Sequence, residues 1–279
     1  MRPLSFALAF AVLAVPPSHP LAAQTGSESN LILTLFGGAV GGHALWAVDR
    51  QPLCVLSGSG PSFGSCDNTS QYDTLRLTRS VSASIMAGVS ATYFRSPHVG
   101  LQAEFAFLGL PFDDSCANVA PYVPDADAKN QQVCDNITAA AHSTSAISLF
   151  AGVIVRASPT HALSPYLRAG AGFVSYYGGT LELSGAFQQG ANLYTRSVIV
   201  DEKPKSTQGS FLLGAGFTSR LSPGYQFRFE FRDAVVPLSR VVGPADLLGR
   251  APSASHTYHH LGLTLGLDVV LERKRGRRY

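Results

Sequence analysis

The stretch that decides the fold is Tyr225–Arg232, YQFRFEFR, in which every odd position is aromatic and every even position is polar or charged. Successive side chains of a β-strand point to opposite faces of a sheet. The octet therefore predicts a strand with an aromatic face and a charged face. Two environments suit such a strand: a soluble β-domain that buries the aromatic face, or a membrane barrel that turns this face toward lipid.

The same alternation of apolar and polar residues recurs along the chain, and several of the segments are long for a globular strand. Together with the octet they predict eight strands. The other seven segments are Leu31–Ala39, Leu77–Val89, Val99–Phe107, Ile147–Val155, Leu167–Phe173, Phe211–Phe217 and Leu261–Leu271.

Two of these segments share a glycine pattern: Ala169–Phe173 reads AGAGF and Leu213–Phe217 reads LGAGF. No GxGxxG motif opens a helix here, so a dinucleotide-binding loop is disfavoured. The glycines lie on the same face as the charged residues. We therefore expect the missing side chains to leave room for bulky side chains on the opposite wall.

The connections between the predicted strands alternate between long and short. The three short ones each contain a Ser-Pro pair, at Ser96-Pro97, Ser158-Pro159 and Ser222-Pro223. Proline presets φ for a turn and is excluded from central strands. The four long ones span residues 44–74, 110–143, 178–207 and 235–256 and are rich in Gly, Ser, Pro, Asn and Asp. This order predicts that all long loops lie at one end of the sheet.

Composition favours the membrane alternative. Charged residues make up only 14% of the chain, and the polar faces of the predicted strands carry mainly Gly, Ser and Thr, unlike a water-covered surface. An Arg that faces lipid at mid-depth costs about 2–4 kcal/mol. The Phe residues of the octet must then face lipid, with Arg228, Glu230 and Arg232 inside a barrel.

With its alternating strands, short turns, long loops and charged interior, the chain resembles the small eight-stranded outer-membrane barrels, the class of the outer membrane protein A and X domains. The resemblance covers residues 24–272 and implies an all-β protein: a single eight-stranded antiparallel transmembrane up-and-down β-barrel with four long extracellular loops and three short periplasmic turns. It implies a monomer in the bacterial outer membrane, in contact with the lipid bilayer and lipopolysaccharide.

Both ends of the chain carry separate signals. Residues 1–23 read as a signal peptide, with Arg2, an apolar run from Phe6 to Val15 and small residues before Gln24. The last strand, with alternating Thr264, Gly266, Val269 and Leu271, is similar to the C-terminal signal of the barrel-assembly machinery. A basic tail, residues 273–279, follows and ends on Tyr279.

Net charge argues against binding to nucleic acid. Without Arg2 and the five basic residues of the tail, 15 Lys and Arg remain against 18 Asp and Glu. The body of the protein is therefore slightly acidic, which is not the footprint of a nucleic-acid-binding protein.

Charged residues on the inward faces are the candidate site. An eight-stranded barrel is just wide enough for side chains to fill it, so we expect a salt-bridge network that plugs the lumen; an ion-selective constriction or a catalytic pocket is the alternative. The predicted network consists of Glu104, Arg156, Arg168, Arg220, Arg228, Glu230, Arg232 and Asp268.

The cysteines and histidines lie near the predicted loops. Four cysteines in an exported protein predict two disulfides, and the simplest pairing closes each loop on itself: Cys54–Cys66 and Cys116–Cys134. The three histidines His256, His259 and His260 lack an acid or a thiol at ligand spacing. They are interpreted as rim residues, and no metal or cofactor is predicted.

These features support three functional hypotheses. The first is a non-enzymatic outer-membrane barrel whose surface loops serve adhesion, binding or protection. The second is a narrow channel for small solutes. The third is an outer-membrane enzyme that hydrolyses lipid or peptide. A soluble lipocalin-like barrel stays open as the alternative to membrane insertion.

Overall fold

The computed structural model describes residues 30–55, 71–122, 128–140, 142–157, 162–177, 181–201 and 206–271. Among them, no helix is long and apolar enough to cross a membrane. The strands are β1 (Asn30–Val40), β2 (His43–Cys54), β3 (Tyr72–Val81), β4 (Ser84–Phe94), β5 (Val99–Ala120), β6 (His142–Arg156), β7 (Leu163–Tyr177), β8 (Leu183–Gln189), β9 (Asn192–Ile199), β10 (Thr207–Ser222), β11 (Tyr225–Val241) and β12 (Ser253–Leu271), and the helix is α1 (Lys129–Ala139).

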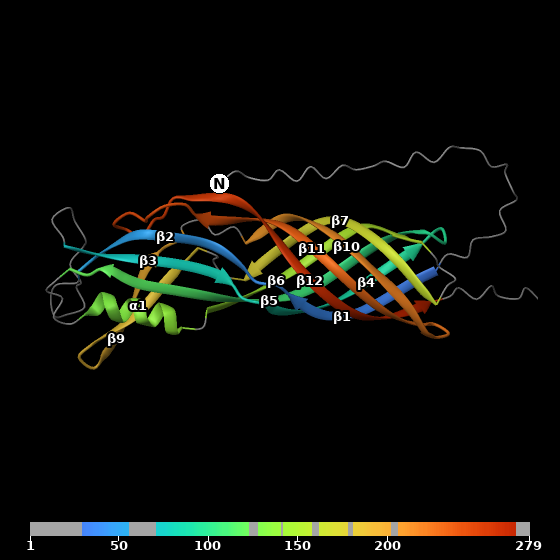
Figure 1. Cartoon of the computed structure of the whole chain (residues 1–279), viewed down its shortest axis with the longest axis horizontal. Helices are drawn as coiled ribbons and strands as arrows, with labels where there is room; N and C mark the ends of the chain where they lie inside the picture. The colour runs from blue at the N-terminus through green and yellow to red at the C-terminus, as the bar shows by residue number, and fades with distance from the viewer. Residues whose placement is uncertain are drawn as a thin grey trace, which may run out of the picture.

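Eight of these strands form a closed barrel, at the right of Figure 1. Neighbouring strands follow the order β5-β4-β1-β12-β11-β10-β7-β6, and β6 pairs with β5 to close the ring. All pairs in the ring are antiparallel. The predicted eight-stranded antiparallel barrel is therefore confirmed.

The octet Tyr225–Arg232 opens β11, between β10 and β12. Its Arg228, Glu230 and Arg232 side chains are buried inside the barrel, whereas Phe231 is 46% exposed on the outside. The charged face of this strand thus points inward, as the pattern predicted. The closed sheet explains this arrangement, because charged side chains on its concave side can form ion pairs with charged side chains from other strands of the ring.

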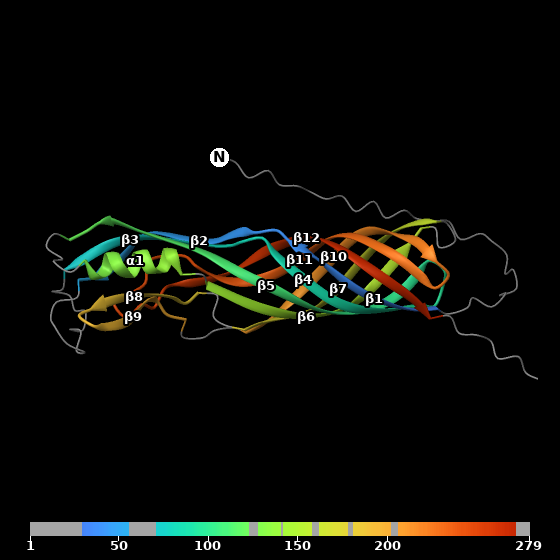
Figure 2. The ribbon, with the colours of Figure 1, turned by 90° about the horizontal axis from the view of Figure 1, so that it is seen from below.

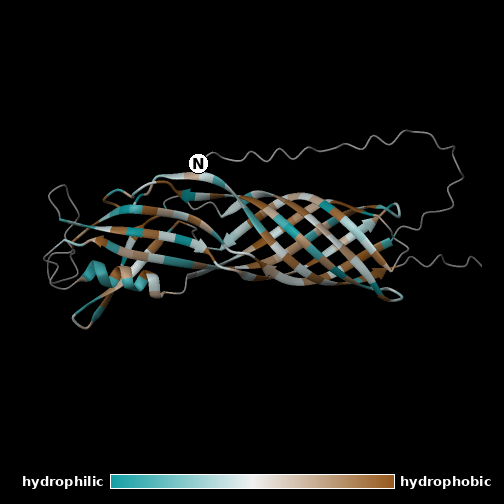
Figure 3. Cartoon of the chain, in the orientation of Figure 1, coloured by the Kyte–Doolittle hydropathy of each residue, from teal (hydrophilic) through white to brown (hydrophobic). Residues whose placement is uncertain are grey.

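An apolar belt covers the outside of the barrel. In Figure 3 brown apolar residues alternate with paler and teal residues along the barrel strands, and the exposed fractions place the large apolar side chains on the outer face. On β12 it includes Leu261, Leu263, Leu265 and Leu267, all between 42% and 52% exposed. A continuous surface of large apolar side chains that are this exposed marks a site of contact with a membrane or with another protein. The other strands contribute exposed Leu35, Val89, Leu101, Phe105, Phe107, Leu149, Val153, Leu167, Phe173, Phe211 and Leu213.

The predicted single strand Leu77–Val89 is wrong: the chain breaks at Ser82-Ala83 into β3 and β4. Leu77 is fully buried, but Ile85 is 78% exposed. The two halves have different partners, because β3 pairs with β2 and the end of β5, while β4 pairs with β1 and the start of β5. The break moves the odd-numbered residues from the inner face to the outer face.

Beyond the belt, the strands continue into an ordered region at the left of Figures 1 and 2, which we call the head. It comprises β2, β3, the second half of β5, α1 and the hairpin β8–β9. The segments predicted as long loops therefore contain regular structure, and β11 and β12 also run far past their predicted ends. In these segments the alternation of apolar and polar residues is weaker, so the sequence pattern predicted loops there.

The short connections agree with turn chemistry where they are described. Between β10 and β11, Ser222 pairs with Tyr225 across Pro223 and Gly224, and Gly224 has φ +83°. Proline followed by a residue with positive φ is the requirement of a type II turn. The Ser96-Pro97 connection is a bend between β4 and β5, and Ser158-Pro159 lies outside the described residues, as do the predicted signal peptide and basic tail.

Candidate functional site

Four buried charges meet at the centre of the lumen: Glu104, Arg168, Glu230 and Arg232, which we call the lumen cluster. Arg168 from β7 donates to Glu104 on β5 at 2.5 Å and also to Glu230 on β11. Arg232 from β11 donates to the other oxygen of Glu104. Two acids and two guanidinium groups balance in charge, so the cluster satisfies the pairing that buried ions require.

Neutral side chains complete this cluster. The Tyr166 hydroxyl donates to Glu230 at 2.7 Å, and Arg168 also donates to the Gln102 amide oxygen at 3.1 Å. A Cβ atom on Gly214 would lie 2.9 Å from Arg168 Nε and 3.2 Å from the Glu230 carboxyl carbon. The glycine of the LGAGF motif thus leaves the space that the Arg168–Glu230 pair occupies.

A second ion pair lies beside the lumen cluster. The Arg228 guanidinium donates to both oxygens of Asp268 at 2.9 Å from Nε and from Nη2, a bidentate arrangement. The Asp268 side chain is fully buried, and the Arg228 guanidinium lies 5.0 Å from the centre of the Tyr166 ring. This stack links the pair to the lumen cluster through Tyr166.

Two predicted members of the network lie elsewhere. Arg220 is exposed at the end of β10, where the pairing register with β11 shifts. Arg156 lies at the turn end, donates to the Pro97 carbonyl at 2.6 Å and covers the Phe94 ring at 3.9 Å. Both assignments to the network were wrong, because alternation fixes the face of a residue but not its depth in the barrel.

Apolar layers close the lumen on both sides of these charges. Toward the turn end, Ile32, Phe94, Ile154 and Tyr166 form one buried cluster. Toward the head, Phe36, Met86, Phe150 and Tyr176 begin a continuous core that extends into the head. A cavity in that upper layer, lined by Arg232 and His260 among others, holds about 20 Å³, roughly the space of one water molecule. The lumen is therefore filled by side chains.

The head contains a buried ion pair that the sequence did not indicate. Arg79 on β3 donates to both oxygens of Asp114 on β5, at 2.6 and 2.8 Å. The guanidinium also lies 4.8 Å from the Phe112 ring and 5.7 Å from the Trp46 ring. Asp114 falls in a segment predicted as a loop, so no face could be assigned to it, and Arg79 lies on the apolar face of the predicted strand Leu77–Val89, where a charged pair was not expected.

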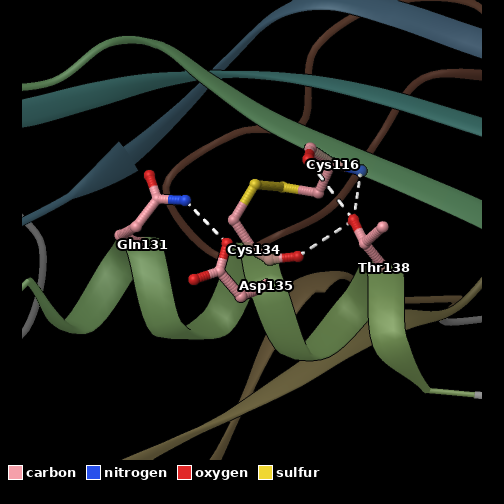
Figure 4. The surroundings of a disulfide bond; sticks show 5 residues. All are labelled: Cys116, Gln131, Cys134, Asp135 and Thr138. Carbon is pink, nitrogen blue, oxygen red and sulfur yellow. Dashed lines mark hydrogen bonds between the residues drawn. A yellow bond between two sulfur atoms is a disulfide. The ribbon is translucent and has the colours of Figure 1, made fainter.

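A disulfide joins the helix to the sheet of the head (Figure 4). Cys116 on β5 is bonded to Cys134 on α1, as predicted. The Thr138 hydroxyl accepts the Cys116 N–H at 3.0 Å and lies 3.2 Å from the Cys134 carbonyl oxygen. Cys54 is also disulfide-bonded, and its predicted partner Cys66 lies outside the described residues.

Arg196 on β9 fastens the hairpin to the rest of the head. It donates to the Asn130 side-chain oxygen at 2.8 Å and to the Cys54 carbonyl at 2.9 Å. Asn130 in turn donates to Asp73 on β3 at 2.8 Å. Burial lowers the pKa of Arg196 to about 10, and the negative charge of Asp73 partly offsets this effect. One polar network therefore connects β2, β3, α1 and β9.

The helix also covers one edge of the hairpin. The backbone N–H groups of Ala186 and Gln188 on β8 donate to the side chains of Asn136 and Gln132, at 2.8 and 2.9 Å. These side chains take the place of a neighbouring strand along β8. The result is a hairpin with one edge sealed by α1.

The three predicted rim histidines point in different directions. His259 faces outward and pairs with Asp233 at 2.7 Å, just beyond the belt residue Leu261. His260 is buried, with its ring 4.7 Å from that of His43. His256 contacts the Tyr258 ring. In the described part of the chain, no three or more His, Cys, Asp or Glu residues are grouped so that they could hold a metal ion.

Comparisons with known proteins identify the fold. No protein-family model and no curated protein matches the chain. The outer membrane protein OprG from Pseudomonas aeruginosa has a solved structure that aligns with a TM-score of 0.51, covering 88% of this chain and 97% of that chain at 10% identity.

Two further solved structures have weaker likeness. Neisserial surface protein A has a TM-score of 0.39 at 10% identity, covering 86% of this chain and 96% of its own. The N-terminal barrel domain of Pseudomonas aeruginosa OprF has a TM-score of 0.33 at 11% identity, covering 88% of this chain and 99% of its own. With the closed ring of eight strands and the likeness to OprG, the chain has the fold of the small eight-stranded outer-membrane barrels.

Proposed function

We propose that the chain is a non-enzymatic outer-membrane barrel with a sealed lumen, which holds a folded head at the cell surface for binding or adhesion. The single observation that carries this proposal is the continuity between barrel and head. The barrel strand β5 continues without interruption into the cross-linked head, β11 and β12 also extend beyond the belt, and the core of the head is continuous with the side chains that fill the upper lumen. Such a barrel would hold the head in a fixed position at the membrane surface.

The apolar belt supports insertion in a membrane. On β12 it reaches from Leu261 to Leu271. At about 3.3 Å per residue and a tilt of about 40°, this span is roughly 25 Å tall, which matches the apolar band of outer-membrane barrels. Short turns face the periplasm in that class, which would place the head outside the cell.

The filled lumen supports a role other than conduction. A solute would have to pass the lumen cluster and both apolar layers, in which the described cavity holds about 20 Å³. Opening a path requires separation of buried ion pairs, which costs about 3–5 kcal/mol for each partner that is left alone. A channel is therefore the weaker candidate.

A hydrolase is also the weaker candidate. His259 and Asp233 form a pair that could polarise a nucleophile, and both lie at the edge of the belt where a lipid substrate would be present. However, in the described part of the chain no Ser or Thr hydroxyl bonds to His259. The pair therefore lacks the third member of a triad.

The topology can be tested with epitope tags on intact bacteria. A tag inserted between Gly190 and Ala191, in the exposed turn of the β8–β9 hairpin, should bind antibody without permeabilisation. The matched control is a tag between Pro223 and Gly224 at the turn end, which should bind only after permeabilisation. Equal labelling of both tags on intact cells would contradict the proposal, and so would recovery of the untagged protein as a detergent-free soluble monomer.

The sealed lumen can be tested by planar-bilayer recording of the refolded protein. We expect no stepwise conductance from the wild-type chain. Stable, ohmic steps of uniform size would favour the channel instead. Contacts with lipopolysaccharide and the barrel-assembly machinery, and a monomeric state, stay predictions from the sequence.

A further inference from the structure

The two edges of the β8–β9 hairpin differ. Along β8, the outward N–H groups of Ala186 and Gln188 are bonded to side chains of α1. In the pairing register these residues stand opposite Thr195 and Leu193. Because outward N–H groups mark the non-hydrogen-bonded pairs of an antiparallel ladder, the backbone groups of Thr195 and Leu193 must point away from β8, toward the other edge.

By the same alternation, Ser197 points its backbone groups the same way, so Leu193, Thr195 and Ser197 form what we call the β9 edge. In the described part of the chain, no hydrogen bond reaches the outward backbone groups of these three residues. Leu193 is 74% exposed, and Thr195 and Ser197 are also exposed. In Figure 1 the hairpin projects from the lower side of the head.

Among the described residues, the β9 edge carries none of the side-chain devices that normally protect a free edge. Protected edges carry charged side chains, proline or a bulge, and the three edge residues are uncharged. The charged residue of this strand, Arg196, is held toward Asn130 and Cys54, away from the open face. The register shift of the hairpin lies at Leu183/Ser184, opposite the far end of β9.

The edge is also held rigidly. Hydrogen bonds of Arg196 link β9 to β2 and α1, and hydrogen bonds to the side chains of Asn136 and Gln132 link β8 to α1. The Cys116–Cys134 disulfide links α1 to β5. A pre-formed strand loses little conformational entropy when it binds a partner. A rigid row of free backbone donors and acceptors with uncharged side chains is the template for addition of one more strand.

We propose that the β9 edge binds an uncharged, extended segment of a partner protein, which adds to the hairpin as a third strand. Backbone hydrogen bonds with Leu193, Thr195 and Ser197 supply the affinity, and the alternate side chains of the segment lie beside Leu193 and Thr195 on the open face. This inference rests on the proposed role of the head in binding, and it names the partner as a polypeptide in β-conformation.

The test uses the full-length protein refolded in detergent, so its result does not depend on membrane location. A phage-displayed library of random nonapeptides is selected on the wild type, and the enriched peptides are synthesised and titrated. Thr195→Pro removes the outward N–H, and its ring stands in the path of the added strand; the β8–β9 ladder stays intact because this N–H is not part of it. Thr195→Val is the matched control, since it keeps the N–H.

We expect enriched peptides to protect the amides of Leu193, Thr195 and Ser197 from hydrogen exchange. Thr195→Pro should weaken their binding roughly tenfold or more, the equivalent of about one or two backbone hydrogen bonds, and Thr195→Val should leave it within about twofold. A failed selection, or peptides that bind the proline variant equally well, would overturn the proposal. If instead the protein dimerises and Thr195→Pro abolishes the dimer, the edge binds a second copy of the chain and the proposal is wrong.

Discussion

Substitution of Glu104 by Gln tests whether the lumen cluster stabilises the barrel. Glu104 is buried, with an exposed fraction of 3%. Its carboxylate accepts hydrogen bonds from both Arg168 and Arg232. Glutamine keeps the shape but removes the charge, so two guanidinium groups are left with one carboxylate, that of Glu230. Breaking a buried pair in this way costs about 3–5 kcal/mol. We expect the lower value, about 3 kcal/mol, because the amide oxygen still accepts one hydrogen bond.

The assay is urea unfolding of the refolded protein in detergent. With a slope of about 2 kcal/mol per M urea, a loss of 3 kcal/mol lowers the midpoint by about 1.5 M. The double variant Glu104→Gln/Arg232→Met restores the balance of charge, with Arg168 and Glu230 still paired, and should recover a large part of this loss. The outward control Phe231→Leu, a swap between apolar residues on the belt, should cost less than about 1.5 kcal/mol.

An unchanged midpoint for Glu104→Gln would refute the reasoning, because it would mean that water already solvates the cluster. A double variant that is as unstable as the sum of its two single variants would also refute it, since charge balance would then be irrelevant. Either result would reopen the channel as a candidate function.

Further predictions follow from the same contacts. Gly214→Ala places a methyl group against Arg168 and should destabilise the barrel by about 1–3 kcal/mol in the urea assay. The control Gly37→Ala should have little effect, because its Cβ would meet its nearest atom at 3.7 Å. Equal losses of stability in the two variants would show that Gly214 has no special packing role. Cys116→Ser should make the head sensitive to protease, because a disulfide across a sequence separation of 18 residues contributes about 3 kcal/mol. We expect the barrel of this variant, like that of the wild type, to migrate as a compact folded band on gels when the sample is not boiled. Loss of the folded barrel band in that variant would show that head and barrel do not fold separately.

The candidate site could be predicted in part. The inward direction of Arg228, Glu230 and Arg232 follows from alternation alone, but the partners in the cluster do not. Tyr166 lies one residue before the predicted strand Leu167–Phe173, so its role as the donor to Glu230 was missed. Arg220 has the predicted polar character but lies at the exposed end of β10, and no pattern along one strand reports depth in the barrel.

The head shows the opposite case. Its residues form strands, a helix and a hairpin, yet the sequence there indicated loops, because Gly, Pro and Asn are frequent and the alternation is short. The break at Ser82-Ala83 was also hidden, since Leu77 through Val89 keeps one parity of apolar residues. The cause of the break is tertiary: β3 and β4 pair with different strands.

The sequence by itself determined that this is a barrel with an apolar exterior and a charged interior, because the two faces of a strand are set by local geometry and repeat every second residue. Only the tertiary structure decided which charges meet, that Glu104 bridges Arg168 and Arg232, and that the head is ordered. Those contacts join strands far apart in the chain, from β5 to β7 and β11, and they depend on the register of every strand between them around the ring. A shift of two residues in any one pair would preserve the whole sequence pattern and yet change each partner.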